Sequence, residues 1–374
     1  MNQESYRKLI SGQSWGVSAT ALRFVLQIAA ASYSSAIGLR NFLYSKGWFK
    51  TYKVNAIVIS VGNITVGGTG KTPLVIWLCN YITKNSKLKT QNCKCAILTR
   101  GYKSTQNQIR DTRYEIQDTK IDEPAILAES CPNVKVIVNP DRVAGANEAV
   151  NKFGAQVLIM DDGFQHRRLA RDLDIVAIDA MCPLGYDRLL PAGLLREPVT
   201  ALKRADAVVI TRCNQIAESD LAILEKKLES VNPNIIITRA IHTPVCAKSL
   251  DHKEIPFEQL KDKRIFAFCG IGNPDAFLDT IRKLGLNLVG SKIYNDHHHY
   301  TENDIGDIHQ QAKHSNAGFI LTTQKDCTKT ALMPLPENDI TFAYLLVELK
   351  FATKNEEDKI TQLIEDTLAG KIPA

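Results

Sequence analysis

The sequence predicts an α/β protein: a P-loop NTPase-like parallel-sheet domain, a second, smaller α/β domain, and an N-terminal membrane-associated helix. Three observations predict this class. A β-branched run leads into a glycine-rich turn at residues 62–70, and a helix-like stretch follows. Apolar strand-like runs then alternate with helix-like segments through most of the chain. The first 45 residues carry a long uncharged helical segment.

The N-terminal segment predicts a helix at a lipid surface. Residues 24–39 carry no charge, and Arg23 and Arg40 flank them. The run is shorter than the roughly 20 residues of a membrane span. Basic and aromatic neighbours, Lys46 and Trp48, favour a helix lying among lipid headgroups. The alternative is a helix that packs on the protein's own core. In either case we expect the catalytic part to lie in the cytoplasm.

The glycine-rich turn has the pattern of a phosphate-binding loop. Glycines let the backbone approach an anion closely, and the N-terminus of the following helix adds favourable dipole charge. Lys71 would reach the β- and γ-phosphates of a nucleotide, and Thr72 would hold Mg²⁺ through its hydroxyl. The alternative is a glycine-rich turn with an exposed lysine. The expected nucleotide-binding residues of the loop are Thr65, Val66, Gly67, Gly68, Thr69 and Gly70. Thr65 stands where most such loops have glycine.

The strand-like runs form two sets. The first lies at residues 95–100, 134–139, 155–163, 173–179, 205–212 and 234–241. The second lies at 264–270, 286–294, 318–323 and 340–349, with helices expected over 275–284 and 356–368. Pro244 and a polar stretch separate the sets. We therefore predict a helix at 1–45, a phosphate-loop domain at 46–243, and a C-terminal α/β domain at 244–374 that closes the active-site cleft.

Two carboxylates end one of the buried runs. Asp161 and Asp162 follow four apolar residues, so a buried strand would deliver them to the carboxyl edge of the sheet. The phosphate loop lies at the same edge, where Mg²⁺ is held by carboxylate or water ligands. The pair could instead cap the next helix, but adjacent carboxylates repel unless a cation compensates. We predict that both bind Mg²⁺.

A histidine cluster occupies residues 297–299 in the second set. Three consecutive histidines cannot all face one site, and a zinc site lacks a further ligand at suitable spacing nearby. One imidazole is better used as a proton relay, with Asp296 fixing its tautomer. A polar loop that caps the helix after Thr301 is an equal alternative.

Composition narrows the possible partners. The net charge of +6 suits an anionic substrate or membrane surface and gives no indication of nucleic acid. Nine cysteines are scattered, and Cys95, Cys213 and Cys269 lie in apolar runs where a thiol usually packs as a small core residue. A reducing compartment follows from this usage.

Together these segments resemble the tetraacyldisaccharide 4'-kinase family of lipid A biosynthesis. The resemblance covers residues from about 10 to 350, and the family carries a small hydroxyl residue at the position of Thr65. The segments that carry it, in order, are GNITVGGTGKTP (62–73), TRGY (99–102), DEP (122–124), DR (141–142), DDGFQH (161–166), RLLPAGLLREP (188–198), GIGNP (270–274), DHHHY (296–300) and TTQKD (322–326).

The resemblance implies a reaction, cofactors and a location. ATP and Mg²⁺ would be the cofactors, and the γ-phosphate would pass to the 4'-hydroxyl of tetraacyldisaccharide 1-phosphate, giving lipid IVA. The partners would be this acylated disaccharide lipid and the membrane surface, without nucleic acid. The enzyme would act as a monomer at the cytoplasmic face of the bacterial inner membrane.

The resemblance also implies roles for single residues. Asp122 would accept the proton of the sugar hydroxyl, supported by His297, while Lys71 would stabilise the transferring phosphoryl group. Two further residues, Gln165 and Arg196, would contact the nucleotide. Glu197 would contact Mg²⁺ or the nucleotide, although an exposed Arg-Glu neighbour pair is often only a surface ion pair. Gln324 departs from the family, which usually has an acidic residue before Lys325.

Two other classes stay open on the residues alone. One is a P-loop NTPase switch or metallochaperone, with Cys93, Cys95 and the histidine cluster as metal ligands. The other is a non-catalytic membrane-binding module that keeps a nucleotide site for stability. Neither class explains why the segments at 122–124, 188–198 and 296–300 occur together with the phosphate loop.

Overall fold

The computed structural model describes residues 3–84, 94–101, 122–296, 298–331, 333 and 340–370. The chain divides into two compact units. The first comprises residues 1–100, 131–242 and 349–374, and the second comprises 101–130 and 243–348. Both are mixed α/β units with mostly parallel strands, which confirms the predicted fold class. The domain boundaries drawn from the sequence stay a prediction.

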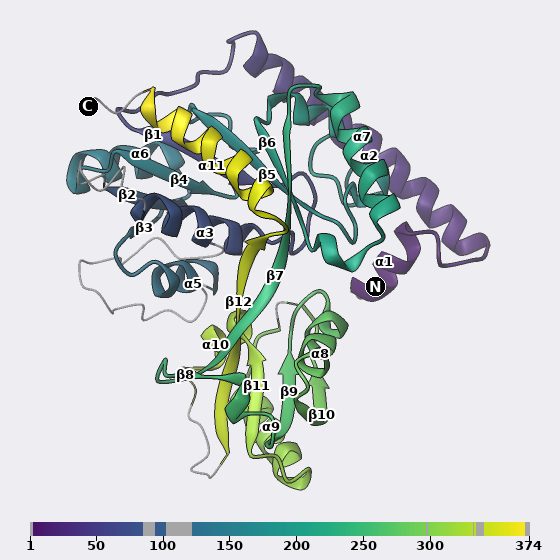
Figure 1. The fold of residues 1–374 in the computed structure, drawn as a ribbon. Coiled ribbons are helices and arrows are strands. Elements are labelled where there is room, and N and C mark those ends of the chain that lie inside the picture. Colours follow the sequence, from purple (N-terminus) through teal and green to yellow (C-terminus); the bar gives the residue numbers. More distant parts are fainter. Residues whose placement is uncertain are drawn as a thin grey trace. The chain divides into compact units, whose positions relative to one another are not determined.

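The first unit is built on a parallel sheet with the strand order β7-β6-β5-β1-β4-β2-β3 (Figure 1). Every pair with a described register in this sheet is parallel. In this order the strands are Ile236–Ser249, Ala207–Thr211, Leu173–Asp179, Ile57–Gly62, Val157–Asp161, Cys95–Thr99 and Lys135–Val138. The sheet contains β1 and β4 as neighbours, which fixes the position of the candidate site described below.

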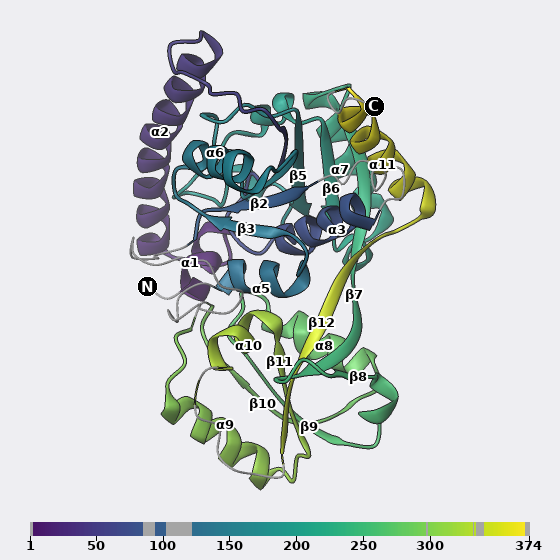
Figure 2. The ribbon, with the colours of Figure 1, turned by 90° about the vertical axis from the view of Figure 1, so that its left-hand side faces the viewer.

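Several helices of the first unit bury apolar side chains. The α-helices of the unit are α1 (Gln3–Ile10), α2 (Val17–Ser45), α3 (Lys71–Lys84), α6 (Arg142–Phe153), α7 (Glu218–Val231) and α11 (Lys354–Ala369), and the 3₁₀ helices are Gly185–Asp187, Val199–Arg204 and Cys213–Gln215. Figure 2 shows α3 and α6 beside the strands. Asp141 caps α6 by accepting from two backbone N–H groups, and Gly154 ends it with φ 63°. Val143 and Ala146 of α6 join Val58 and Leu158 of the strands in one buried cluster.

The second unit has a smaller sheet. Its strands β10 (Asn287–Ile293), β9 (Arg264–Cys269), β11 (Phe319–Thr323) and β12 (Thr341–Phe351) pair in parallel, and β8 (Glu254–Ile255) pairs antiparallel with β7. The helices are α5 (Asp122–Ser130), α8 (Pro274–Lys283), α9 (Glu302–His314), α10 (Gln324–Thr330) and the 3₁₀ helix Phe257–Gln259. Both β7 and β12 contribute residues to the two units.

Each strand-like run of the sequence overlaps an observed strand, but β7 continues beyond its predicted end. It passes through Pro244, which was expected to lie in a linker. The pairs of β7 with β6 end at Ile210 and Arg239, and its pairs with β8 begin at Ala247. The proline therefore lies between the residues that pair with β6 and those that pair with β8.

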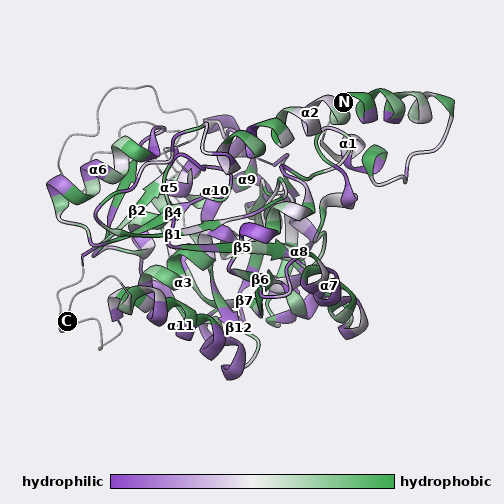
Figure 3. Ribbon diagram, turned by 90° about the horizontal axis from the view of Figure 1, so that it is seen from above, coloured by the Kyte–Doolittle hydropathy of each residue, from purple (hydrophilic) through white to green (hydrophobic). Residues whose placement is uncertain are grey.

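The helix α2 is 29 residues long, and no residue in it is buried. Hydrophobic positions recur along it (Figure 3), and Phe24, Ile28 and Leu39 are each more than half exposed. By length and composition α2 could cross a membrane, with a mean hydropathy of 1.2 over its most apolar window. The predicted alternative of a core-packed helix would bury an apolar stripe, which α2 does not do.

Candidate active site

The phosphate loop follows β1 and ends where α3 begins at Lys71. Gly67 and Gly70 have φ values of 117° and 79°, which side-chain-bearing residues rarely adopt. Two hydrogen bonds hold Thr69 in place. Asn63 Nδ2 donates to Thr69 Oγ1 over 3.0 Å, and Thr211 Oγ1 donates to the Thr69 carbonyl over 2.9 Å. The loop is therefore held in shape by groups on its own unit, as a site for an anion requires.

A second segment pairs with the start of this loop. Thr65 and Leu195 form an antiparallel bridge. The Val66 N–H donates to the Leu194 carbonyl over 2.8 Å, and the Arg196 N–H donates to the Ile64 carbonyl over 2.7 Å. We call residues 188–198 the REP segment. Thr65 is 4% exposed and extended against this segment, so the position does not need the conformational freedom of glycine.

Asp162 is brought to Lys71 by the topology of the sheet. The parallel register of β1 and β4 places Val61 opposite Asp161, and Asp162 follows in a left-handed turn with φ 51°. The Lys71 Nζ lies 3.5 Å from Asp162 Oδ1, and Arg196 Nη1 donates to both carboxylate oxygens over 2.9 and 2.8 Å. The sequence-predicted residues Lys71, Asp162 and Arg196 thus form one cluster.

The charges in this cluster set the protonation of Asp162. Burial alone would raise the pKa of its carboxyl group, but Lys71 and Arg196 outweigh burial, so the pKa lies below its ordinary value. The carboxylate is therefore ionised at neutral pH and pairs with both cations.

Asp161 has different surroundings from its neighbour. Its side chain is 2% exposed, and Thr99 Oγ1 donates to its Oδ2 over 3.4 Å. The buried Arg142 donates to the Asp161 carbonyl over 3.0 Å. Thr72 is half-buried in the first turn of α3. Among the described residues no group of three or more His, Cys, Asp or Glu could hold a metal ion. Magnesium bound to a nucleotide needs fewer protein ligands, because phosphate oxygens and waters complete its coordination shell.

Glu197 has the most heavily paired carboxylate of the site. It is fully buried, and its oxygens lie 3.3 Å from Arg40 Nη2 and 3.1 Å from Arg204 Nη2. Asn41 Nδ2 also donates to it over 3.0 Å. Gln165 donates to the Asn63 carbonyl over 2.7 Å, at the base of the loop. The predicted magnesium contact of Glu197 and nucleotide contact of Gln165 stay predictions.

The predicted base and its partner lie outside the described residues. His297 is not described, and Asp122 is described only as the first backbone position of α5. Nearby, Asp296 lies 3.5 Å from the Lys325 Nζ, and His298 Nε2 lies 3.2 Å from Asp304. The capping alternative is confirmed in part, because Thr301 caps α9 in a capping box with Asp304.

Gln324, the departure from the family pattern, has a defined contact within the second unit. It donates to Glu129 of α5 over 3.2 Å. An acidic residue at position 324 would face Glu129 as a like charge, so glutamine and glutamate here form a compatible pair.

Several residues around the loop have no local sequence signal. Arg212 pairs with Asp179 over 2.7 Å and also donates to the Gly68 carbonyl. His242 packs against Gly70, where an added Cβ would lie 2.7 Å from its Nε2. Burial and the charge of Arg212 lower the pKa of His242 to about 4, so its imidazole is neutral. Asp179 ends the β5 run, and that strand-end position is the one signal by which the sequence could have shown it.

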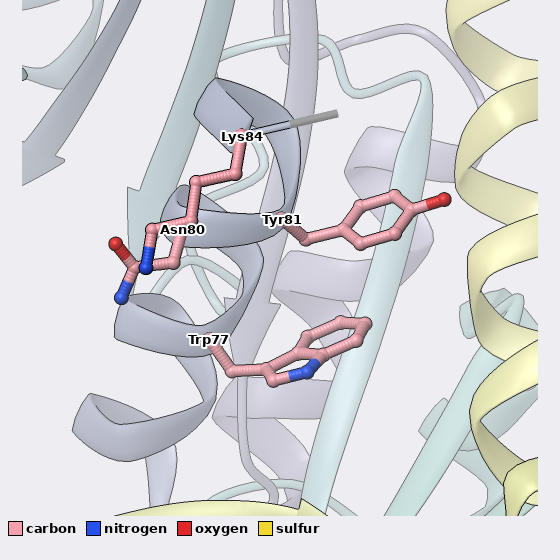
Figure 4. Close-up of a pocket in the computed structure, with 4 residues that line it drawn as sticks. All are labelled: Trp77, Asn80, Tyr81 and Lys84. Atoms are coloured by element: carbon pink, nitrogen blue, oxygen red, sulfur yellow. The ribbon is translucent and has the colours of Figure 1, made fainter. Parts of the chain in front are cut away.

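A cavity of about 400 Å³ lies further along α3. Figure 4 shows the side chains that line it: Trp77, Asn80, Tyr81 and Lys84. The indole of Trp77 stacks on Tyr81 with ring centres 5.5 Å apart. Among the residues with described side chains, none of the predicted site residues lines this open pocket.

The comparison with protein families matches residues 22–368 to the model described as tetraacyldisaccharide-1-P 4'-kinase. This chain belongs to that family. It is 36% identical to the tetraacyldisaccharide 4'-kinase of Syntrophus aciditrophicus, covering 91% of this chain and 93% of the relative. It is 38% identical to that of Geobacter sulfurreducens, covering 87% and 89%. The resemblance predicted from the motifs is confirmed.

A solved structure of the same family has a similar fold. The apo form of LpxK from Aquifex aeolicus, in complex with ATP, superposes with a TM-score of 0.70 at 30% identity. The match covers 92% of this chain and 99% of that one. The family membership therefore extends across both units of the chain and includes a relative that binds ATP.

Proposed function

We propose that this protein is an ATP-dependent lipid kinase that phosphorylates the 4'-hydroxyl of tetraacyldisaccharide 1-phosphate, giving lipid IVA in lipid A biosynthesis. Its family and its relatives carry this name. The observation that carries the proposal is the cluster of Lys71, Asp162 and Arg196 at the phosphate loop. A P-loop switch or metallochaperone has no comparable support, because the family match spans nearly the whole chain.

The residues of the loop site suit phosphoryl transfer. The transition state is loose, so positioning and charge neutralisation supply most of the rate. The amide groups of the loop and the Lys71 ammonium would bind the β- and γ-phosphates. Arg196 and Lys71 both hold Asp162, which fixes their side chains before a nucleotide arrives.

Magnesium fits the donors at this edge of the sheet. Thr72, Asp161 and Asp162 offer hydroxyl and carboxylate oxygens, the donors that Mg²⁺ prefers. When bound, Mg²⁺ neutralises charge on the phosphate oxygens. Asp122 is proposed as the base for the sugar hydroxyl, with His297 as its partner.

We also propose that α2 docks the enzyme on the cytoplasmic face of the inner membrane. Its apolar side chains are exposed along the helix, with Phe24, Val25 and Ile28 each over half accessible. The acyl chains of the substrate keep it in the bilayer, so docking on the surface avoids extraction of the lipid into water. A monomer suffices for this arrangement.

A direct assay tests the proposed reaction. The full-length protein is incubated with Mg²⁺, γ-labelled ATP and detergent-dispersed monophosphorylated acyl disaccharide. The expected product is a doubly phosphorylated lipid that carries the label. Lys71→Met should abolish the transfer, because the variant lacks the ammonium group that would neutralise the negative charge of the γ-phosphate. Label released only as inorganic phosphate would contradict the lipid-kinase proposal and favour an NTPase.

A further inference from the structure

The REP segment lies between two parts of the first unit that the sequence treats as separate. On one side it pairs with the phosphate loop, through the backbone of Leu194 and Arg196. On the other side α2 contacts it: Tyr33 Oη donates to the Arg196 carbonyl over 2.9 Å, and Arg40 and Asn41 bind Glu197. The helix proposed to dock on lipid is thus in direct contact with the segment that supports the loop.

Glu197 is the residue on which these contacts converge. A fully buried carboxylate is costly unless it is paired and hydrogen-bonded. Here Arg204 supplies a cation from the body of the unit, Arg167 adds positive charge nearby, and α2 supplies a further cation and an amide. Removal of Arg40 would leave this charge with only part of its compensation, so the position of Glu197 depends on α2.

The adjacent Arg196 transmits this position to the phosphate site. Its side chain binds both oxygens of Asp162, and Asp162 lies beside Lys71. Its backbone N–H binds the loop at Ile64. A shift of the Arg196-Glu197 backbone would therefore disturb both the loop and the cluster of charges at its end.

We propose that Arg40 and Asn41 of α2 are positioning residues for the phosphate site. They fix Glu197, and through the adjoining Arg196 they fix Asp162 and Lys71. The inference rests on the proposed function for the identity of the nucleotide. Its consequence is that α2 serves two purposes, because the helix that contacts lipid also holds the nucleotide site in its binding geometry.

The test compares two arginines of the same helix. Arg40→Gln removes the contact with Glu197, whereas Arg23→Gln removes an equal charge from the same helix, at the other end of the uncharged run. The affinity for a fluorescent Mg·ATP analogue is measured on the full-length protein without lipid. Arg40→Gln should weaken it by about tenfold, as expected when a buried charge loses a partner. Arg23→Gln should stay within about twofold.

Two further variants separate positioning from loss of the fold. Arg40→Lys keeps the charge and should restore most of the affinity. Asn41→Ala removes the hydrogen bond that Asn41 donates to Glu197 and the one that it accepts from Arg40 over 3.5 Å, but it keeps Arg40 and Arg204 beside Glu197. It should weaken nucleotide binding by about threefold, with an unchanged unfolding midpoint. If Arg40→Gln does not fold, Asn41→Ala decides: unchanged affinity there overturns the proposal.

The remaining outcomes are also decisive. If Arg40→Gln and Arg23→Gln weaken the nucleotide affinity equally, the effect is a general one of charge and the proposal is overturned. Unchanged nucleotide affinity in both variants would also overturn it.

Binding to anionic vesicles should fall similarly in both variants, since each loses one basic residue. If the wild-type protein fails to phosphorylate the disaccharide lipid, the proposed function fails, whereas the nucleotide-affinity result still tests the role of Arg40.

Discussion

At the scale of single residues, the adjacent Asp161 and Asp162 have different contacts. The sequence predicted that Asp161 and Asp162 lie at the edge of the sheet beside the loop, because parallel neighbouring strands bring their carboxyl ends together. It did not predict the contact of Asp162 with Lys71. That contact depends on the left-handed backbone of Asp162, with φ 51°, which no side-chain pattern encodes.

The lowered pKa of Asp162 predicts a pH-dependent contribution to stability. A carboxylate with a depressed folded-state pKa stabilises the protein above its unfolded pKa of about 4, and this contribution is lost as pH falls through the folded-state value. Asp162→Asn should therefore cost about 1.5–3 kcal/mol of unfolding free energy at pH 7, the range for hydrogen bonds to charged groups. The difference from wild type should shrink towards pH 3.

Urea unfolding of the two proteins between pH 3 and pH 7 measures this difference. Asp279→Asn is the matched control, because that carboxylate is more than half exposed in its ion pair with Arg282. A wild-type advantage over Asp162→Asn that stays constant with pH would show that the ion pairs of Asp162 do not produce it.

At the scale of elements, the loop and its support come from distant parts of the chain. The sequence identified the loop from its glycines and the REP segment from the family pattern. It gave no sign that Val66 and Leu194 would pair, because backbone pairing across this separation depends on the folded topology. For the same reason Arg40 was read only as the flank of an apolar run, although it binds a buried glutamate.

Two glycines of the loop should respond differently to alanine. Gly70 has φ 79°, and an added Cβ would lie 2.7 Å from His242 Nε2 and 3.2 Å from Thr211. Gly68 has no described atom within 4 Å of an added Cβ and no positive φ. Gly70→Ala should therefore lower the free energy of unfolding by about 1–2 kcal/mol through backbone strain. The clash of the added Cβ with His242 should lower it further. Gly68→Ala should leave the unfolding midpoint unchanged.

Thermal unfolding of both variants, alongside nucleotide affinity, checks this expectation. Gly70→Ala should also bind Mg·ATP more weakly, because Lys71 follows it directly. Equal midpoints in the two variants would show that the loop relaxes freely and that its observed shape is not required.

At the scale of the whole molecule, the sequence predicted most strands, and helices at the N-terminus, after the phosphate loop, and over 275–284 and 356–368. The apolar runs are strong local signals, since buried parallel strands read as continuous hydrophobic stretches. The assignment of elements to the two units has no such local signal in the sequence. The helix α5 clusters with residues 243–348, although β2 and β3 on either side of it belong to the first unit. The helix α11 clusters with the first unit, to which the end of β12 belongs.

The exposed face of α2 gives a prediction about membrane binding. Ile28 and Ile223 are 57% and 65% exposed, one on α2 and one on α7. Burying such a side chain in a lipid interface is worth about 1.5–3 kcal/mol. Ile28→Gln should weaken binding to anionic phospholipid vesicles by about tenfold or more, and Ile223→Gln should not change it. Equal effects in vesicle sedimentation would place the docking surface elsewhere.

The second unit holds the two residues proposed for proton transfer. Two residues of α10 contact the neighbouring segments of this unit. Gln324 binds Glu129 of α5, and Lys325 pairs with Asp296. Asp122 begins α5 and His297 follows Asp296, so one short helix anchors both segments in the same unit. The side chains of Asp122 and His297 lie outside the described part of the chain, so their joint role stays a proposal.

A double-mutant cycle tests that joint role. Asp122→Ala and His297→Ala should each lower kcat by about 10²–10⁴, the usual contribution of general acid-base catalysis, with little change in ATP affinity. If the two act as one unit, the double variant should lose no more than the worse single variant. His299→Ala, at an exposed position in the same cluster, should keep kcat within about twofold. Losses that multiply in the double variant would mean that Asp122 and His297 act independently, and the base would then need no histidine partner.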